Sequence, residues 1–337
     1  MWFEKLTGFP EKSANFIKEN LTIEGTDFIS KINNKRFSFG ELEVTTLEQL
    51  KNKSIELENY QGEIQLNEIV ANVSELHTNI KNSNSLFQAA SQFNLLEMVN
   101  PSITPEHGID RYEFDYTQGP ACAIACGAGT IYRNYFVNLD NQHGQTAEKQ
   151  IDCLDLIGVE LDNENLKLWE MQNGYALISQ DSLLKINKKI GQLNYNQREK
   201  LKEKLKIGIQ WNTEVTNSTT RHKVSQIYCS ALPVAYCKTD SIYWEPFARI
   251  ILEATYEATL YTALINLEKN KSNVVYLTLV GGGAFGNEER WILESIQKAI
   301  LKFKNTPLDV KIVSYGRSKS KLLNFIEETK LSLKKTE

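Results

Sequence analysis

The sequence predicts an α/β fold whose sheet is largely parallel, and three observations lead to this prediction. From residue 224 onward, apolar runs of the length of buried strands alternate with segments whose apolar residues recur at helical spacing. A glycine-rich turn at 281–286 joins one of these strands to the helix that follows it. Strands that alternate with helices in this way are typical of parallel sheets.

The C-terminal elements have the clearest patterns. Residues 224–236 predict a strand that runs into a loop, and apolar residues at 247–265 recur on one face of a helix. The continuous apolar run at 274–280 is typical of a strand buried on both faces. After the glycine-rich turn, the pattern predicts an amphipathic helix at 288–303 and a last strand at 309–315.

The N-terminal half is less regular. An alternating segment at 64–70 predicts a strand, and residues 73–80 predict a helix. The run at 86–94 begins apolar and ends polar, as a buried strand does when its carboxyl end opens onto a site. Residues 140–215 are polar and helical. Lysines and glutamates interleave at helical spacing within 183–206, which indicates a solvent-exposed face.

Composition excludes several classes of function. The chain has 337 residues, with 38 lysines and arginines against 42 aspartates and glutamates, so no surplus of positive charge favours nucleic acid. No apolar run approaches the roughly 20 residues that span a bilayer, and the first residues lack the pattern of a signal peptide. We therefore expect a cytoplasmic protein that binds neither nucleic acid nor a membrane.

Metal sites and reactive thiols are not indicated. The five cysteines include no CxxC pair, and the four histidines have no metal-ligand spacing. A pair of Cys122 or Cys126 with His143 could form a thiolate–imidazole nucleophile, but nothing in the sequence fixes its geometry. The sequence therefore predicts free thiols and no metal.

The glycine-rich turn has the spacing G-x-G-x-x-G between a strand and a helix. Backbone N–H groups at the start of that helix would face a phosphate, with Asn287 as the N-cap. A nicotinamide-dependent oxidoreductase is therefore one alternative. Against it, only one strand remains after the turn, and no acidic residue ends that strand to bind a ribose. A Walker loop is excluded because Gly286 is followed by Asn-Glu-Glu.

A second cluster of small residues lies at 118–130, after Asp110 and Asp115. Small residues permit close approach of the backbone to a ligand or to another part of the chain. Two interpretations therefore remain open, a tight loop beside a ligand and close packing of helices.

Several segments resemble the macrodomain family. The run Leu252-Glu-Ala-Thr-Tyr-Glu-Ala-Thr-Leu-Tyr-Thr-Ala, the strand 274–280, the turn Gly-Gly-Gly-Ala-Phe-Gly-Asn287 and the strand 309–315 look like the C-terminal half of a macrodomain. Upstream, 88–94 and 118–129 take the places of its Ala-Asn strand end and first glycine-rich loop. The Thr-Gln-Gly-Pro-Ala-Cys sequence and the insertion look most like a divergent branch of macrodomain-type ADP-ribosyl hydrolases. That branch is associated with ADP-ribosyl-arginine, including ADP-ribosylated ubiquitin. The Gln-Glu-Glu that follows the glycine loop of poly(ADP-ribose) glycohydrolases is absent.

The resemblance implies a macrodomain-like three-layer α/β/α core with a mixed, largely parallel sheet. Residues 1–84 would be an N-terminal extension packed on this core. Residues 85–337 would form the ADP-ribose-binding domain, with a helical insertion at about 140–215. We expect a monomer that requires no cofactor and that takes ADP-ribose as ligand or product.

By the same resemblance, ADP-ribose lies in a cleft between the 118–130 and 281–287 segments. Gln92 and Asn94 would hold the distal ribose, although both could instead bond to loop backbone. Phe285 and Tyr315 would stack on the ribose and adenine side, or belong to the core. The remaining candidate ligand residues are Gln118, Gly119, Gly127, Ala128, Gly129, Thr130, Gly281, Gly282, Gly283, Ala284, Gly286 and Asn287.

Release of ADP-ribose requires cleavage of the C1″ glycosidic bond through an oxocarbenium-like state, which a carboxylate can assist. The candidates, in order of preference, are Asp115, Asp110 and Glu214. Each could instead cap a turn or pair with an arginine. If the leaving group is a guanidine, the same acids could bind its planar donors by bidentate hydrogen bonds.

The expected function is hydrolytic removal of ADP-ribose from a modified protein, arginine-linked by resemblance, with ADP-ribosylated ubiquitin as one candidate partner. A non-catalytic module that binds ADP-ribose or an NAD metabolite would have the same loops but would not need the acids. The oxidoreductase remains the second alternative.

Overall fold

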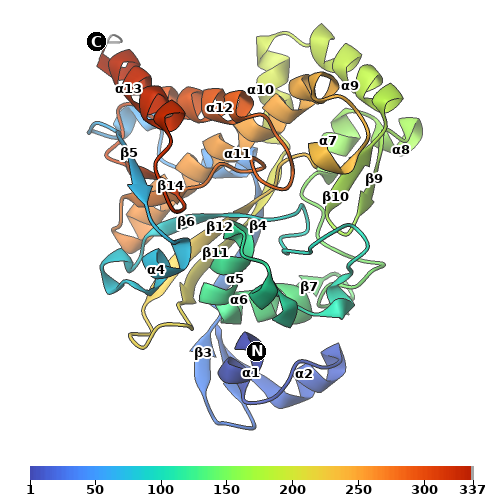
Figure 1. The fold of residues 1–337 in the computed structure, drawn as a ribbon, viewed down its shortest axis with the longest axis vertical. Coiled ribbons are helices and arrows are strands. Elements are labelled where there is room, and N and C mark those ends of the chain that lie inside the picture. Colours follow the sequence, from blue (N-terminus) through green and yellow to red (C-terminus); the bar gives the residue numbers. More distant parts are fainter. Residues whose placement is uncertain (335–337) are drawn as a thin grey trace.

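The computed structural model describes residues 1–334 and centres on a seven-stranded sheet (Figure 1). The strands, in spatial order, are β4 (Glu41–Thr46), β11 (Lys206–Glu214), β12 (Lys223–Cys229), β6 (Leu86–Ala90), β13 (Val274–Leu277), β14 (Asp309–Ser314) and β5 (Gln65–Val70). From β12 to β5 every neighbouring pair is parallel, whereas β11 runs antiparallel to β12 and to β4. The predicted α/β fold with a mixed, largely parallel sheet is confirmed.

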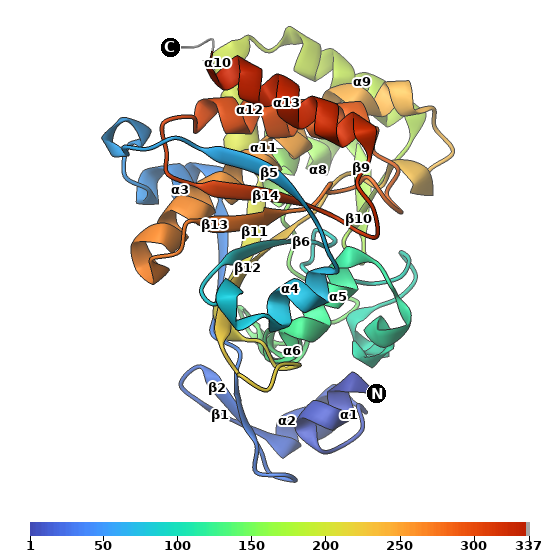
Figure 2. The same cartoon turned by 60° about the vertical axis from the view of Figure 1, so that its left-hand side comes forward.

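Helices cover both faces of this sheet, which gives three layers (Figure 2). One face is covered by α11 (Ser241–Asn270), α12 (Glu289–Lys302) and α13 (Ser320–Lys334), and α3 (Leu47–Lys53) packs beside α11. The other face is covered by α4 (Val73–Thr78), α5 (Gln118–Ala125) and α6 (Gly127–Ile131). Because both faces are covered, consecutive residues of central strands such as β6 and β13 are buried, rather than every second one.

The sequence analysis assigned residues 1–84 to an N-terminal extension packed on the core. The structure instead places two strands of this segment in the central sheet. Strands β4 and β5 form its two edges, and their partners β11 and β14 lie far away in the chain. A separate N-terminal module does precede β4. It contains α1 (Trp2–Thr7), α2 (Ala14–Asn20) and a small antiparallel sheet of β1 (Leu21–Glu24), β2 (Asp27–Ser30) and β3 (Arg36–Ser38). Its apolar cluster packs against the α5–α6 side of the core.

The chain between η5 (Tyr132–Phe136) and β11 overlaps the helical insertion predicted at about 140–215, but it contains strands as well as helices. It contains the pairs β7 (Asn138–Leu139) with β8 (Gln142–His143) and β9 (Trp169–Gln172) with β10 (Tyr175–Ile178), and the helices α7 (Asp155–Glu160), α8 (Asn163–Leu166), α9 (Gln180–Gln192) and α10 (Tyr195–Glu203). From Lys206 the chain enters β11 of the central sheet. The lysine-rich face is not wholly solvated, because Lys202 is buried and pairs with Glu199, Glu253 and Glu257.

Short one-turn helices connect the remaining parts. They are η1 (Leu57–Asn59), η2 (Ile80–Asn82), η3 (Pro105–His107), η4 (Asp110–Phe114), η5 (Tyr132–Phe136) and η6 (Val234–Tyr236). Within residues 1–334, no helix combines the length and the apolar character needed to cross a bilayer.

A buried histidine makes the stability of this fold depend on pH. His77 in α4 is fully buried and stacks on Phe87, with ring centroids 3.8 Å apart, and its Nδ1 lies 2.7 Å from the Val73 carbonyl oxygen. Burial lowers the pKa of His77 from 6.5 to about 4, although the Val73 carbonyl partly offsets this effect. The folded state therefore favours the neutral ring.

We expect the contribution of His77 to be complete above pH 6.5 and to be lost as the pH falls toward 4. The shift corresponds to about 3 kcal/mol of unfolding free energy. Urea unfolding between pH 7 and pH 4 should show a smaller loss in His77→Gln than in the unsubstituted protein. Equal losses in the two proteins would contradict this role.

Candidate functional site

A cavity of about 290 Å³ opens at the carboxyl ends of β6 and β13. In parallel sheets this edge is where ligands bind, because loops of both strands meet there. Four groups of residues line the cavity. The end of β6 and the loop after it provide Ala90, Ser91, Gln92, Glu97, Met98 and Val99, and the start of α5 provides Asp115, Thr117, Gln118, Gly119 and Pro120. The segment after β13 provides Thr278, Leu279, Val280, Gly281, Gly283, Ala284 and Phe285, and the remaining lining residues are Tyr175, Ala231 and Tyr236.

The glycine-rich turn forms one wall. Gly281 and Gly286 adopt positive φ angles of 78° and 71°, which glycine allows at little cost. The Asn287 backbone N–H closes the turn by donating to the Gly281 carbonyl at 2.9 Å, and its Nδ2 anchors the turn by donating to the Leu232 carbonyl at 2.8 Å. The sequence analysis predicted Asn287 as the N-cap of α12, but Glu288 takes that position.

The backbone N–H groups at the cavity also differ from those that the sequence analysis expected to face a phosphate. The first turn of α12 is not among the residues that line the cavity, whereas Gly283, Ala284 and Phe285 are. Within residues 1–334, the backbone N–H groups of these three residues make no hydrogen bond. The turn itself therefore offers free donors to an anion.

Asp115 provides a carboxylate at the start of α5. Its Oδ1 accepts hydrogen bonds from the Thr117 backbone N–H at 2.9 Å and from the Thr117 hydroxyl at 2.6 Å. In the described residues its second oxygen, Oδ2, accepts no hydrogen bond. The Thr117 contacts thus fix the side chain while one oxygen stays available to a ligand or a water molecule.

Glu97 provides a second carboxyl group that the sequence analysis did not identify. It is 5% exposed, and its Oε1 has no hydrogen-bond partner in the part of the chain described. Burial raises the pKa of Glu97 well above its usual 4.5; the Arg133 charge lowers it in part and Asp115 raises it further. The sequence feature that could have pointed to Glu97 is an acidic residue within the mostly apolar segment Phe93-Asn-Leu-Leu-Glu-Met98.

Three aromatic rings also line the cavity. Tyr175 of β10, Tyr236 of η6 and Phe285 of the glycine-rich turn lie with ring centroids 4.9, 5.3 and 5.6 Å apart. The insertion therefore contributes to the site through Tyr175. A cavity lined by both aromatic rings and carboxyl groups suits a planar cation as well as a sugar ring.

The predicted ribose-binding amides hold the loop backbone instead. The Gln92 side chain accepts from the Met98 N–H at 2.7 Å and donates to the Met98 carbonyl at 3.2 Å. Asn94 is fully buried and bonds to Leu96 and Gln150. Gln92 still lines the cavity, but Asn94 does not. Of the two interpretations left open for these amides, backbone satisfaction is the observed one.

The 118–130 segment is helical rather than a loop. Gln118 and Gly119 line the cavity at the start of α5, and the Gln118 amide bonds to the backbone of Gln88 and Ala90 in β6. The remaining candidates Gly127, Ala128, Gly129 and Thr130 are buried in α6 and do not line the cavity. A Cβ on Gly127 would meet Trp2 and one on Gly129 would meet Gln210, so these glycines permit close packing.

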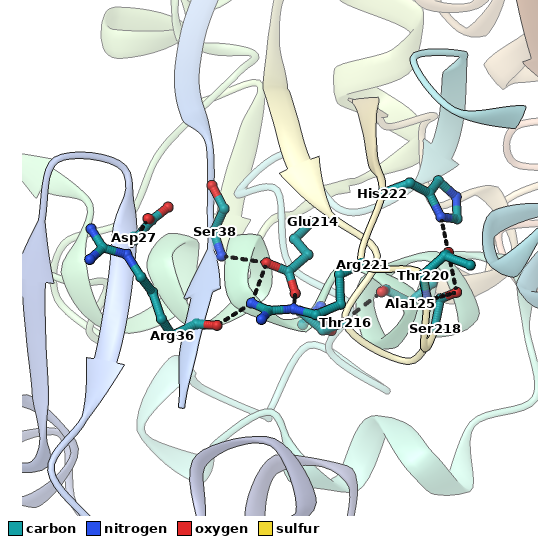
Figure 3. A network of polar contacts seen from close by, with 11 residues as sticks. Asp27, Arg36, Ser38, Ala125, Glu214, Thr216, Ser218, Thr220, Arg221 and His222 are labelled. Carbon is teal, nitrogen blue, oxygen red and sulfur yellow. Dashed lines mark hydrogen bonds and ion pairs between the residues drawn. The ribbon is translucent and has the colours of Figure 1, made fainter. Parts of the chain in front are cut away.

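Asp110 and Glu214 lie away from this cavity. Asp110 accepts a hydrogen bond from the Phe3 N–H at 3.3 Å and so holds α1. Glu214, at the end of β11, accepts from Arg221 Nε at 2.7 Å and from the Ser38 N–H at 3.1 Å, and Arg221 also donates to the Arg36 carbonyl (Figure 3). The structure thus places neither acid at this cavity, and both bond to residues of the N-terminal module.

Replacement of Glu214 by alanine tests that structural role. Because Arg221 is largely exposed, solvent screens the pair, and we expect a loss of about 1–2 kcal/mol in unfolding free energy. The affinity for ADP-ribose, measured by calorimetry, should not change, and neither property should change in the exposed control Glu41→Ala. If Glu214→Ala lost ADP-ribose binding but kept its stability, Glu214 would have a role in ligand binding rather than a structural one.

Tyr315 lies in an adjoining cavity of about 450 Å³. Asp115, Thr117, Gln118 and Thr278 line both cavities. Tyr315 is 81% exposed, so it is not a core residue and its ring is free to stack on a flat group. Among the described residues, no three His, Cys, Asp or Glu side chains gather as a metal site would require.

Comparison with known proteins gives only distant likenesses. No protein-family model and no curated protein sequence matches the chain. Among solved structures, the poly(ADP-ribose) glycohydrolase of Deinococcus radiodurans in complex with ADP-ribose shares 10% identity over 87% of this chain and 94% of its own, with a TM-score of 0.44. That of Thermomonospora curvata, bound to the inhibitor ADP-HPD, shares 10% over 94% and 97%, with a TM-score of 0.45. Likenesses this weak do not decide the function, which is argued from the residues of the site.

Proposed function

We propose that this protein is a hydrolase that binds ADP-ribose and removes it from arginine side chains of a modified protein. The observation that carries this proposal is the meeting of free backbone donors at 283–285 with the carboxyl groups of Asp115 and Glu97 in one cavity. The macrodomain-like order of the glycine-rich turn and its flanking elements supports ADP-ribose as the ligand.

The diphosphate would lie against the glycine-rich turn. No lysine or arginine is among the residues that line the cavity, so the backbone N–H groups of Gly283, Ala284 and Phe285 would supply the donors to the phosphate oxygens. Tyr315, in the adjoining cavity, is available to stack on the adenine ring. The distal ribose would then occupy the 290 Å³ cavity, with C1″ facing the carboxyl groups.

The chemistry is hydrolysis of the C1″–N bond and requires no cofactor. The bond to the guanidine nitrogen breaks as a water oxygen bonds to C1″, through an oxocarbenium-like state. Asp115, held by Thr117, would accept the proton of that water and stabilise the developing positive charge.

The linkage to arginine is supported by the composition of the cavity wall. A guanidinium is a planar cation, which aromatic faces and carboxyl groups bind together. Tyr175, Tyr236 and Phe285 provide the aromatic faces, Asp115 provides the carboxylate, and Glu97 adds a second carboxyl oxygen as a hydrogen-bond acceptor. A serine, aspartate or glutamate linkage would place no cationic group next to these aromatic and carboxyl side chains.

Intact-mass spectrometry of defined ADP-ribosylated proteins tests the proposal. Arginine-linked proteins, with ADP-ribosylated ubiquitin among them, should lose one ADP-ribose mass, whereas serine- and glutamate-linked proteins should not. Loss from another linkage would contradict the arginine assignment. Binding of ADP-ribose without any loss would favour a non-catalytic binding module, and reduction of a carbonyl compound with nicotinamide consumption would favour the oxidoreductase.

A further inference from the structure

The loop after β6 carries a buried carboxyl group without a structural partner. Glu97 is 5% exposed and lines the cavity, and in residues 1–334 its Oε1 makes no hydrogen bond. Buried polar atoms in proteins are almost always bonded, so an orphan oxygen at a cavity calls for an explanation. Its other oxygen, Oε2, occupies the space beside Gly119, where a Cβ would overlap it. Glycine at the start of α5 thus leaves room for a carboxyl group from another segment.

The backbone of this loop is fixed on both sides of Glu97. The Glu97 N–H donates to the Tyr112 hydroxyl at 2.8 Å. Asn94 Oδ1 and Gln92 Oε1 accept from the backbone N–H groups of the preceding and following residues, at 3.1 and 2.7 Å. The two amides predicted to bind ribose therefore position the loop that presents Glu97. A group held in this way is preorganised for chemistry at a fixed point.

We propose that Glu97 is the proton donor to the leaving nitrogen in the hydrolysis proposed above, an inference that rests on that function. As the C1″–N bond breaks, its electron pair returns to the guanidine nitrogen, which takes the proton of the Glu97 carboxyl group. The water oxygen bonds to C1″ and its proton goes to Asp115. The products are ADP-ribose and an arginine guanidinium, and exchange with solvent restores both carboxyl groups.

The surroundings of the two acids support this division of roles. Glu97 is buried, which raises its pKa and so favours the protonated form that a proton donor needs. Asp115 is more exposed and is held by two hydrogen bonds from Thr117. Two carboxyl groups in such different surroundings, one buried and one partly exposed, are typical of an acid and base pair.

The test compares Glu97→Gln with the unsubstituted protein and with Glu160→Gln, an exposed control on α7, using an arginine-ADP-ribosylated protein as substrate. Glutamine keeps the shape of the side chain but cannot donate an acidic proton. We expect kcat to fall about 100- to 10,000-fold in Glu97→Gln, with KM and calorimetric ADP-ribose affinity within about threefold of the unsubstituted protein. Glu160→Gln should match the unsubstituted protein.

The pH profile separates catalysis from a structural role. The titratable or charged groups that interact electrostatically with Glu97 are Asp115, Arg133, Tyr112, Cys122, Tyr175 and Tyr228. In the unsubstituted protein, activity should fall as the pH rises through the pKa of Glu97, and Glu97→Gln should lack this fall. The variant should also be at least as stable at neutral pH, because a raised acid pKa means that stability is lost as the pH rises above 4.5.

The outcomes distinguish the two proposals. An active protein whose Glu97→Gln variant keeps kcat within threefold would overturn the role of Glu97 and leave the hydrolase in place. Equal loss of ADP-ribose affinity and activity in the variant would make Glu97 a binding or folding residue and would also overturn the inference. An unsubstituted protein that releases no ADP-ribose from any linkage would overturn the proposed function and, with it, this inference.

Discussion

Replacement of Asp115 by asparagine is expected to lower the turnover of arginine-linked substrate about 100- to 10,000-fold. Asparagine keeps an oxygen that can accept the two Thr117 hydrogen bonds, so the start of α5 should remain intact. It removes the negative charge and the basic oxygen that would take a proton from the attacking water. Activity should therefore be lost while the cavity keeps its shape.

Steady-state kinetics and calorimetric titration with ADP-ribose check this prediction. The affinity for ADP-ribose should stay within about threefold, because the diphosphate is assigned to the backbone donors at 283–285 rather than to Asp115. Asp181→Asn on the exposed face of α9 is the matched control and should not alter either quantity. Full turnover in Asp115→Asn would show that this carboxylate does not take part in the reaction.

Replacement of Gly281 by alanine is expected to displace the glycine-rich turn. Gly281 has a φ of 78°, which costs a residue with a side chain about 1–2 kcal/mol. A Cβ there would also lie 2.5 Å from the Ala231 Cβ and 2.7 Å from Asn287 Nδ2, the atom that anchors the turn to Leu232. We expect ADP-ribose affinity to fall at least tenfold and the unfolding free energy to fall by about 2 kcal/mol.

Gly283→Ala is the matched control within the same turn. A Cβ on Gly283 meets nothing within 4 Å, so the unfolding free energy should change by less than about 0.5 kcal/mol. If phosphate oxygens approach the turn closely, this variant should lose affinity without losing stability. Unchanged ADP-ribose affinity in Gly281→Ala would contradict the assignment of the turn to the diphosphate.

The sequence predicted the C-terminal half of the fold well because its signals are local. Strand β13, the glycine-rich turn, α12 and β14 each follow from apolar periodicity and turn residues within a few positions of the chain. The edge strands β4 and β5 could not be assigned to the central sheet in this way. Each is recognised only through its partner, β11 or β14, which lies more than 150 residues away.

The candidate site was predicted only in part, for a related reason. Asp115 and the 281–286 turn have local signals, an acid before a run of small residues and a glycine-rich motif. The small residues at 127–130 give the same signal but pack against Trp2 and Gln210, which no local pattern reveals. Glu97 has no motif at all. Its importance comes from burial beside Gly119, which depends on how the loop after β6 meets α5.

A crystal structure of the complex with ADP-ribose tests the central claim most directly. We expect phosphate oxygens within hydrogen-bond distance of the backbone N–H groups of Gly283, Ala284 and Phe285, and C1″ of the distal ribose beside Glu97 and Asp115. ADP-ribose bound with C1″ directed away from both carboxyl groups, or with its diphosphate distant from the glycine-rich turn, would contradict the account.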